Sequence, residues 1–297
     1  MRLTDIFLAV LVAALWGFNF VVIHLGIDAF PPLMFSALRF VLAAFPLVFF
    51  LPRPKTGWGI ILGIGTVLGV VKFALLFLGM DTGLSAGLAS LVLQSQAFFT
   101  VILAALLLSE RPSARQLAGI ALAFTGIGIV ALTMNGQTTH TGLTLVLSAA
   151  MAWALSNLLM KKAGQVNMLS LMVWVSLVPP IPLICLSLIF EGWQASADAI
   201  TGLDLTGVGA VLYIAYAATI FGFAVWGKLI SQYGAGTIAP FSLLVPVFGM
   251  TSSAVFLGED LGATKLLAAA LVISGLILTV LKPSKITRPL AGAQSRS

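Results

Sequence analysis

Two basic residues interrupt stretches of the sequence that are otherwise apolar. Arg39 follows the run PPLMFSAL, and Lys72 follows the run GIILGIGTVLGVV. A charged side chain inside an apolar segment is costly, so such residues usually serve a function or lie beside an opposite charge. Guanidinium and ammonium groups bind carboxylates, which makes an anionic ligand the first hypothesis. The alternatives are structural: Arg39 reaches the aqueous boundary or pairs with Asp28 or Asp81. Lys72 pairs with Asp81 or with a backbone carbonyl.

Uncharged polar and aromatic residues form a second group of candidates. Amide side chains inside apolar segments contact either a ligand or a neighbouring helix, and both interpretations stay open here. Large aromatic residues in the same segments are suited to wall a cavity. The candidate substrate-binding residues are Trp16, Asn19, Arg39, Lys72, Gln94, Gln96, Trp153, Asn157, Tyr213 and Ser242.

Two short motifs resemble catalytic signatures but lack the required context. Residues 83–87 (GLSAG) match the G-x-S-x-G pattern, which needs a strand-to-helix elbow, a histidine and an acid. Residues 222–228 (GFAVWGK) approach a phosphate loop, but Leu229 replaces the required serine or threonine. His24 and His140 are too few and too far apart for a metal site. No reactive cluster indicates an enzyme, and we expect neither a cofactor nor a metal.

The composition indicates a chain that is embedded in a lipid bilayer. It is 60% hydrophobic and 8% charged, and its mean hydropathy is +1.13. Soluble domains contain about 25% charged residues. The net charge of +6 does not indicate a nucleic-acid partner, because the cations lie in short loops rather than in a patch. The single cysteine, Cys185, supports no disulfide framework.

The apolar runs predict ten membrane-spanning helices. A spanning helix needs about 20 apolar residues, and every backbone polar group in the bilayer core needs an internal partner. The predicted spans are 6–26, 33–51, 58–79, 86–108, 115–134, 141–160, 168–190, 207–228, 237–257 and 264–282.

The charges of the loops predict the orientation of these spans. Ten spans place both termini on one side of the membrane. The loops on that side hold twelve cations, whereas Lys265 is the only cation of the opposite loops. The positive-inside rule therefore predicts that both termini are cytoplasmic. The twelve cations are Arg2, Arg53, Lys55, Arg111, Arg115, Lys161, Lys162, Lys228, Lys282, Lys285, Arg288 and Arg296.

The sequence also contains an internal repeat. Residues 86–132 align without a gap with residues 235–281, at an offset of 149 positions, so that Glu110 matches Glu259 and Gly126 matches Gly275. Five spans per repeat is an odd number, so the second repeat inserts upside down. We therefore predict an all-α integral membrane protein with ten transmembrane helices, arranged as two inverted five-helix repeats around a central cavity. The predicted units are 1–136, 137–283 and a basic cytoplasmic tail over 284–297.

Two prolines distinguish the second repeat from the first. Pro240 and Pro246 lie in the ninth predicted span, whereas the matching positions of the fourth span carry no proline. Proline removes a backbone donor and frees a carbonyl, and such breaks line binding sites in transporters. We predict a hinge at Pro240 and Pro246, and we expect the two halves to move differently.

Several runs resemble a known family of membrane proteins. They are Trp16-Gly-Phe-Asn-Phe, Arg39-Phe, Ala86-Gly-Leu-Ala-Ser, Ser109-Glu-Arg, Ala239-Pro, Pro246 and Gly258-Glu. These runs resemble the EamA domains of the drug/metabolite transporter superfamily. WGFNFVVI, GLASLVLQSQAFFT and APFSLLVPV are similar to the amino-acid exporters of the cysteine and O-acetylserine type. The resemblance implies a bundle that moves small metabolites out across the bacterial inner membrane.

We therefore expect a secondary transporter that exports amino acids or related small metabolites by alternating access. Arg39, Lys72 or both would bind the substrate carboxylate, and Trp16 and Trp153 would hold its ammonium by cation–π contact. The amides of Asn19, Gln94, Gln96 and Asn157 would supply hydrogen bonds. The alternatives are a broad-specificity drug or metabolite efflux protein, a membrane-embedded enzyme, and a structural or signalling membrane protein. The exact substrate, the coupling ion and the oligomeric state stay open.

Overall fold

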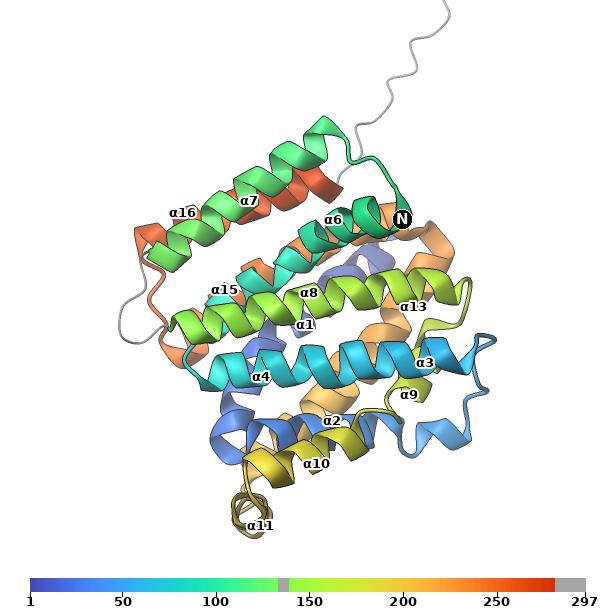
Figure 1. Cartoon of the computed structure of the whole chain (residues 1–297), viewed down its shortest axis with the longest axis vertical. Coiled ribbons are helices and arrows are strands. Elements are labelled where there is room, and N and C mark those ends of the chain that lie inside the picture. Colours follow the sequence, from blue (N-terminus) through green and yellow to red (C-terminus); the bar gives the residue numbers. More distant parts are fainter. Residues whose placement is uncertain (133–138, 281–297) are drawn as a thin grey trace, which may run out of the picture.

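The chain folds into a bundle of long apolar helices. The computed structural model describes residues 1–132 and 139–280 (Figure 1). Ten helical segments in this part are long and apolar enough to cross a membrane. The fourth and seventh segments, Ala86–Leu108 and Met168–Phe190, coincide with the predicted spans. The predicted end of the tenth span at 282, the boundary at 136 and the tail at 284–297 lie outside the described residues.

The first five spans contain eight helical stretches besides two short turns of 3-10 helix. They are α1 (Leu3–Ala29), α2 (Pro32–Ala44) with η1 (Leu47–Phe49), α3 (Trp58–Ile64) with η2 (Gly65–Lys72) and α4 (Phe73–Asp81), α5 (Ala86–Val92) with η3 (Leu93–Ser95) and α6 (Gln96–Leu108), and α7 (Ala114–Leu132).

The last five spans follow the same plan, with one addition. They are α8 (His140–Ala163), α9 (Met168–Val175) with α10 (Pro180–Phe190), α12 (Leu205–Leu212) with η4 (Tyr213–Phe221) and α13 (Gly222–Tyr233), α14 (Ala235–Ile238) with η5 (Ala239–Leu243) and α15 (Leu244–Leu257), and α16 (Ala263–Val280). The addition is α11 (Trp193–Thr201), a short helix that the sequence did not predict because it is too short and too polar to span a bilayer.

Departures from α-helical geometry occur in pairs that obey the offset of the repeat. The π-helix η2 covers 65–72, and the π-helix η4 contains 214–221, which are the same positions plus 149. The 3-10 turn η3 covers 93–95. The repeat mates of its first two residues are 242 and 243, and both lie in the 3-10 turn η5. The internal repeat therefore extends into the third and eighth spans, where sequence identity alone had not revealed it.

The packing of α7 against α16 shows that the repeats are inverted. These two helices match one another in the repeat and lie side by side (Figure 1). A Cβ atom added to Gly119 would lie 2.6 Å from the carbonyl oxygen of Gly275, and one added to Gly126 would lie 2.8 Å from that of Ala268. Helix α7 therefore runs antiparallel to its repeat mate α16. When each residue is replaced by its repeat mate, the contact between Gly119 and Gly275 becomes the contact between Ala268 and Gly126. A two-fold axis between the repeats requires this relation.

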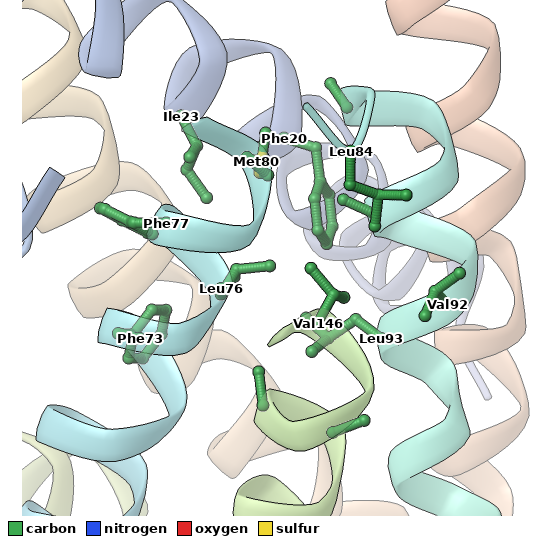
Figure 2. Packing of buried hydrophobic residues seen from close by; sticks show 14 of the residues in the cluster. Phe20, Ile23, Phe73, Leu76, Phe77, Met80, Leu84, Val92, Leu93 and Val146 are labelled. Carbon is green, nitrogen blue, oxygen red and sulfur yellow. The ribbon is translucent and has the colours of Figure 1, made fainter. Parts of the chain in front are cut away.

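The buried core joins helices from both repeats. Figure 2 shows Leu76 of α4 next to Val146 of α8, with Phe73 and Phe77 of α4 on the other side of Leu76 and with Phe20 and Ile23 of α1 in the same cluster. Since lipid is as apolar as these side chains, helix association depends on close packing rather than on the removal of apolar surface from water. Phe73 belongs both to this core and to the polar cluster described next.

Candidate functional site

Two buried cations lie against one phenylalanine ring in the interior of the bundle. Arg39 of α2 and Lys72 of η2 are each only 4% exposed. The guanidinium carbon of Arg39 lies 4.0 Å from the centre of the Phe73 ring, and the ammonium nitrogen of Lys72 lies 3.3 Å from it. Lys72 also lies 4.8 Å from the ring centre of Trp153. We call Arg39, Lys72, Phe73 and Trp153 the cation cluster.

The hydrogen bonds of Arg39 exclude the structural partners that the sequence suggested. Its Nε and Nη2 atoms donate to the hydroxyl of Thr219, at 3.2 and 2.9 Å. Its Nη1 atom is buried and has no hydrogen-bond partner in the part of the chain that the structure describes. Within the described residues the ion pairs are Arg2–Asp5 and Lys161–Glu110. Arg39 therefore neither pairs with Asp28 or Asp81 nor extends to the aqueous boundary.

Lys72 likewise lacks the partners suggested for it. Asp81 lies nine residues further along the same span, about 13 Å away by helical rise. No hydrogen bond from the ammonium of Lys72 to a backbone carbonyl is found in the part of the chain that the structure describes. The contacts of this ammonium that the described residues provide are with the rings of Phe73 and Trp153. A buried ammonium without an anion is costly, so Lys72 is a candidate for function rather than a packing residue.

Each of the two π-helices contributes one polar residue to the cation cluster or to its hydrogen bonds. Lys72 is the last residue of η2, and Thr219 lies within η4. The Thr219 hydroxyl donates to the carbonyl of Ile214 at 2.7 Å, across the five-residue spacing of a π-turn. This bond leaves the hydroxyl oxygen free to accept from Arg39. Single π-turns inside α-helices often mark functional positions, and here both repeat-related π-helices meet at one site.

A pocket lies at the end of the bundle that contains Glu110, and one face of α8 connects it with the cation cluster. The pocket has a volume of about 180 Å³, and Thr100, Asn157 and Lys161 contribute to its wall. Lys161, Asn157 and Trp153 follow one another at four-residue intervals, so they lie on one face of the helix. The distance from Lys161 to Trp153 is about 12 Å along the axis. Asn157 therefore lies between the pocket and the cluster along this face of α8.

Two of the predicted amides bind one another on this path. The Nδ2 atom of Asn157 donates to the side-chain oxygen of Gln96 at 2.7 Å and to the hydroxyl of Thr100 at 3.1 Å. Asn157 borders the pocket, so this small network of neutral donors and acceptors is within reach of a ligand there. Gln96 of α6 and Asn157 of α8 thus make the contact between neighbouring helices that was one of the two interpretations of these amides.

Gln94 and Ser242 form a second contact between the repeats. The Nε2 atom of Gln94 in η3 donates to the backbone oxygen of Ser242 in η5, at 3.3 Å. In a continuous helix that oxygen would accept the backbone N–H of residue 246. Pro246 has no N–H, so the carbonyl is available to the amide of the other repeat. The proline thus creates the acceptor that joins the two irregular turns.

The predicted hinge at Pro240 and Pro246 coincides with an irregular turn of the ninth span, and the fourth span contains a matching turn. Pro240 lies at the start of η5, and Pro246 lies in the first turn of α15. However, η3 interrupts the fourth span at the matching place without any proline. The break therefore depends on the position in the fold, and the prolines stabilise a break that both repeats contain.

Replacing Pro246 by alanine tests the role of this break. The new N–H should bind the carbonyl of Ser242, compete with Gln94 and lengthen the regular part of α15. We expect slower turnover with little change in substrate affinity. Transport rate and binding should be measured separately on the purified variant, with Pro240→Ala as a comparison. Unchanged turnover in a folded Pro246→Ala protein would make the proline a packing feature.

The remaining predicted residues join α1 to η4 rather than lining the pocket. The indole nitrogen of Trp16 donates to the carbonyl of Ala218 at 2.8 Å, and the hydroxyl of Tyr213 donates to that of Leu15 at 2.8 Å. The Trp16 ring packs 5.5 Å from Phe223 and 5.0 Å from Trp226. Asn19 is buried in α1, and its Oδ1 atom has no hydrogen-bond partner among the described residues.

The two ends of the bundle differ in how repeat-related residues are paired. At one end both carboxylate oxygens of Glu259 accept from the backbone N–H of Gly87, at 3.3 and 3.2 Å. At the other end Glu110, the mate of Glu259, pairs with Lys161 at 2.5 Å. Gly236, the mate of Gly87, has open space where a Cβ would be. The contact between Glu259 and Gly87 thus has no counterpart between their repeat mates Glu110 and Gly236 among the described residues.

Sequence reasoning missed three residues that complete the site. Phe73 separates the two cations, Thr219 binds Arg39, and Thr100 binds Asn157. Thr219 and Thr100 are hydroxyl residues inside apolar spans. Many residues that only pack share this feature, so it did not single these two out. No pattern in the sequence indicates that Phe73 faces both cations.

Ten spans, inverted repeats and buried polar groups at helix irregularities define the architecture of a secondary transporter. The family model described as the EamA-like transporter family matches residues 3–132 and 140–281. The chain belongs to the EamA-like transporter family.

Curated relatives and a solved structure agree with this assignment. The chain is 44% identical over 282 residues to a protein of Salmonella typhimurium strain LT2, covering 93% of this chain and 94% of that protein. It is 43% identical over 279 residues to a protein of Escherichia coli strain K12, covering 92% and 93%. Both are named "Probable amino-acid metabolite efflux pump". A crystal structure at 16% identity matches with a TM-score of 0.62 over 94% of this chain and 98% of the other, which supports the fold alone.

Proposed function

We propose that this transporter exports amino acids or related small metabolites and that Arg39 and Lys72 bind the substrate carboxylate. The observation that carries the proposal is the buried guanidinium whose Nη1 atom lacks a partner, beside a buried ammonium on the same ring. A carboxylate would satisfy both groups by charge-assisted hydrogen bonds. The names of the two bacterial relatives support the substrate class.

The substrate reaches the cluster by alternating access. It enters the pocket at the Glu110 end, passes Asn157 and Trp153, and meets Lys72 and Arg39. The irregular turns η3 and η5 are the proposed hinges, because helix breaks absorb the change in backbone angles that domain motion requires. Release follows when the Glu259 end opens and the Glu110 end closes.

The loop charges support a cytoplasmic position for both termini and for the Glu110 end. A reporter that is active only in the cytoplasm should give signal when it is fused after Ser297. The same reporter should be silent when it is inserted in the loop at 192–205, because that loop lies on the side with few cations. A silent fusion at Ser297 together with an active one at 192–205 would reverse the orientation.

Transport into proteoliposomes tests the function directly. The purified protein should take up labelled amino acids or their derivatives, and the rate with and without a pH gradient shows whether protons drive the exchange. Decarboxylated analogues should be poor substrates. Equal transport of these analogues and of unrelated drug-like cations would favour a broad-specificity efflux protein instead.

A further inference from the structure

Two buried atoms of opposite hydrogen-bonding character lack a partner in the interior of the bundle. In the part of the chain that the structure describes, the buried side-chain atoms without a partner are four serine hydroxyls, Nη1 of Arg39 and Oδ1 of Asn19. A hydroxyl can donate or accept, whereas Nη1 can only donate and Oδ1 can only accept. A buried polar group without a partner is costly. A ligand that supplies one acceptor and one donor would satisfy Arg39 and Asn19 together.

The side chain of Asn19 faces η4. Successive residues of an α-helix are rotated by about 100°, so Asn19 lies between the directions of Trp16 and Phe18. The indole of Trp16 donates to the carbonyl of Ala218 at 2.8 Å. The ring of Phe18 lies 5.6 Å from that of Tyr213. Ala218 and Tyr213 both belong to η4, so the buried amide between their two partners on α1 points at this helix.

Arg39 reaches the same stretch of η4 from α2. Its guanidinium donates to Thr219, the residue that follows Ala218. Helices α1, α2 and η4 are in contact with one another. The unpartnered acceptor of Asn19 and the unpartnered donor of Arg39 therefore border one segment of η4, between Tyr213 and Thr219.

An α-amino acid presents both groups that this pair requires. Its carboxylate accepts hydrogen bonds, and its ammonium donates them. The two groups are attached to one carbon, so they need a cation and an acceptor on neighbouring helices, as Arg39 and Asn19 are. A hydrogen bond from an ammonium to a neutral oxygen is charge-assisted and stronger than one between neutral groups.

The other groups suited to an ammonium are occupied or distant. Within the described residues, the acidic residues of the ten spans lie in the first or last turn of a helix. The Trp16 ring packs against Phe223 and Trp226. The Trp153 ring already faces the ammonium of Lys72. The amide oxygen on α1 is thus the acceptor at η4, and it adds no buried charge of its own.

We propose that Asn19 binds the ammonium of the substrate through Oδ1, while Arg39 and Lys72 bind its carboxylate. The inference rests on the proposed function, because it takes the carboxylate site from it. It moves the ammonium from the indoles of Trp16 and Trp153, where the sequence placed it, to an amide oxygen. Asn19 then selects amino acids over carboxylates that lack the amine, and the amine must keep an N–H to donate.

Three compounds test the inference in the parent protein. They are L-serine, 3-hydroxypropionate, which lacks the amino group, and N,N,N-trimethyl-L-serine, which retains the positive charge but has no N–H. KM values are measured for the labelled compounds in proteoliposomes. If L-serine is not transported, a transported amino acid of the panel and its two corresponding analogues replace the set. We expect the amino acid to have at least a roughly tenfold lower KM than either analogue, the ratio that one charge-assisted hydrogen bond supplies.

Replacing Asn19 by leucine removes the acceptor and retains a side chain of similar size. In Asn19→Leu the preference for L-serine over both analogues should be lost, while the KM for 3-hydroxypropionate changes little. A preference over the trimethyl compound that came from its size would remain. Lys72→Met is the comparison: it should raise the KM for L-serine and for 3-hydroxypropionate alike, because both carry the carboxylate. Asn19→Ala, which also lacks the acceptor, takes the place of Asn19→Leu if that variant does not accumulate in the membrane.

The outcomes separate this inference from the proposed function. If the Asn19 variants kept the preference for L-serine over 3-hydroxypropionate, the ammonium site would be overturned and the carboxylate site would stand. A trimethyl derivative that binds as tightly as L-serine would also overturn the ammonium site, because a cation held by aromatic rings needs no N–H. Absence of transport for the whole amino-acid panel would overturn both proposals.

Discussion

Transport of carboxylate substrates should fall about 10–150-fold when Lys72 or Arg39 loses its charge, the loss expected from one charge-assisted contact of about 1.5–3 kcal/mol. Lys72→Met retains most of the side-chain volume and removes the ammonium. Arg39→Ala also removes the two bonds to Thr219. Rates and KM values should be measured in proteoliposomes for a carboxylate substrate and for its decarboxylated analogue.

The decarboxylated analogue and a second lysine serve as controls. Its transport should change little in Lys72→Met, because it has no carboxylate for the missing ammonium. Lys265→Met removes a cation that lies outside the cluster, and it should transport both compounds like the parent protein. An equal loss for both compounds in the cluster variants, or a failure of those variants to accumulate in the membrane, would assign the cations to folding.

Replacing Gly275 by alanine should lower the thermal stability of the protein. The added Cβ would lie 2.4 Å from the carbonyl oxygen of Gly119 and 2.9 Å from the Cβ of Ala123, so α7 and α16 would have to separate. Overpacking of this kind typically costs about 1–3 kcal/mol. The midpoint of thermal unfolding in detergent should therefore fall.

Gly128 provides the matched control in α7. An added Cβ there meets no atom within 4 Å. Alanine in a helix is more favourable than glycine by about 0.5–1 kcal/mol, so Gly128→Ala should maintain or raise the midpoint. If Gly275→Ala and Gly128→Ala shifted the midpoint alike, the close contact between α7 and α16 would not contribute to the stability of the protein.

The sequence was sufficient for the spans because lipid imposes a simple length rule. A run of about 20 apolar residues has few alternatives to a transmembrane helix. The repeat of Glu110 as Glu259 and of Gly126 as Gly275 indicated the inverted pairing. The π-helices η2 and η4 could not be predicted, since a π-turn has the same apolar composition as the α-helix around it. The short helix α11 lies between two spans, and the length rule for transmembrane helices does not apply there.

The site was only partly predictable for a related reason. Arg39 and Lys72 stood out because charges in apolar spans are rare. Trp16 and Tyr213 were expected to wall a cavity, yet their polar atoms hydrogen-bond to the backbone of neighbouring helices. Which helices touch, and therefore that Thr219 of the second repeat binds Arg39 of the first, depends on packing that spacing along the chain does not encode.

The contact between α7 and α16 has a further consequence for the motion. When the two repeats exchange conformations, the contact of Gly119 with Gly275 becomes that of Gly126 with Ala268, and both are already present. The contact of Gly87 with Glu259 becomes that of Gly236 with Glu110, which is absent because Glu110 pairs with Lys161. In the proposed alternating-access cycle, the α7–α16 contact would therefore be retained, whereas the contacts of Glu259 and Glu110 would alternate.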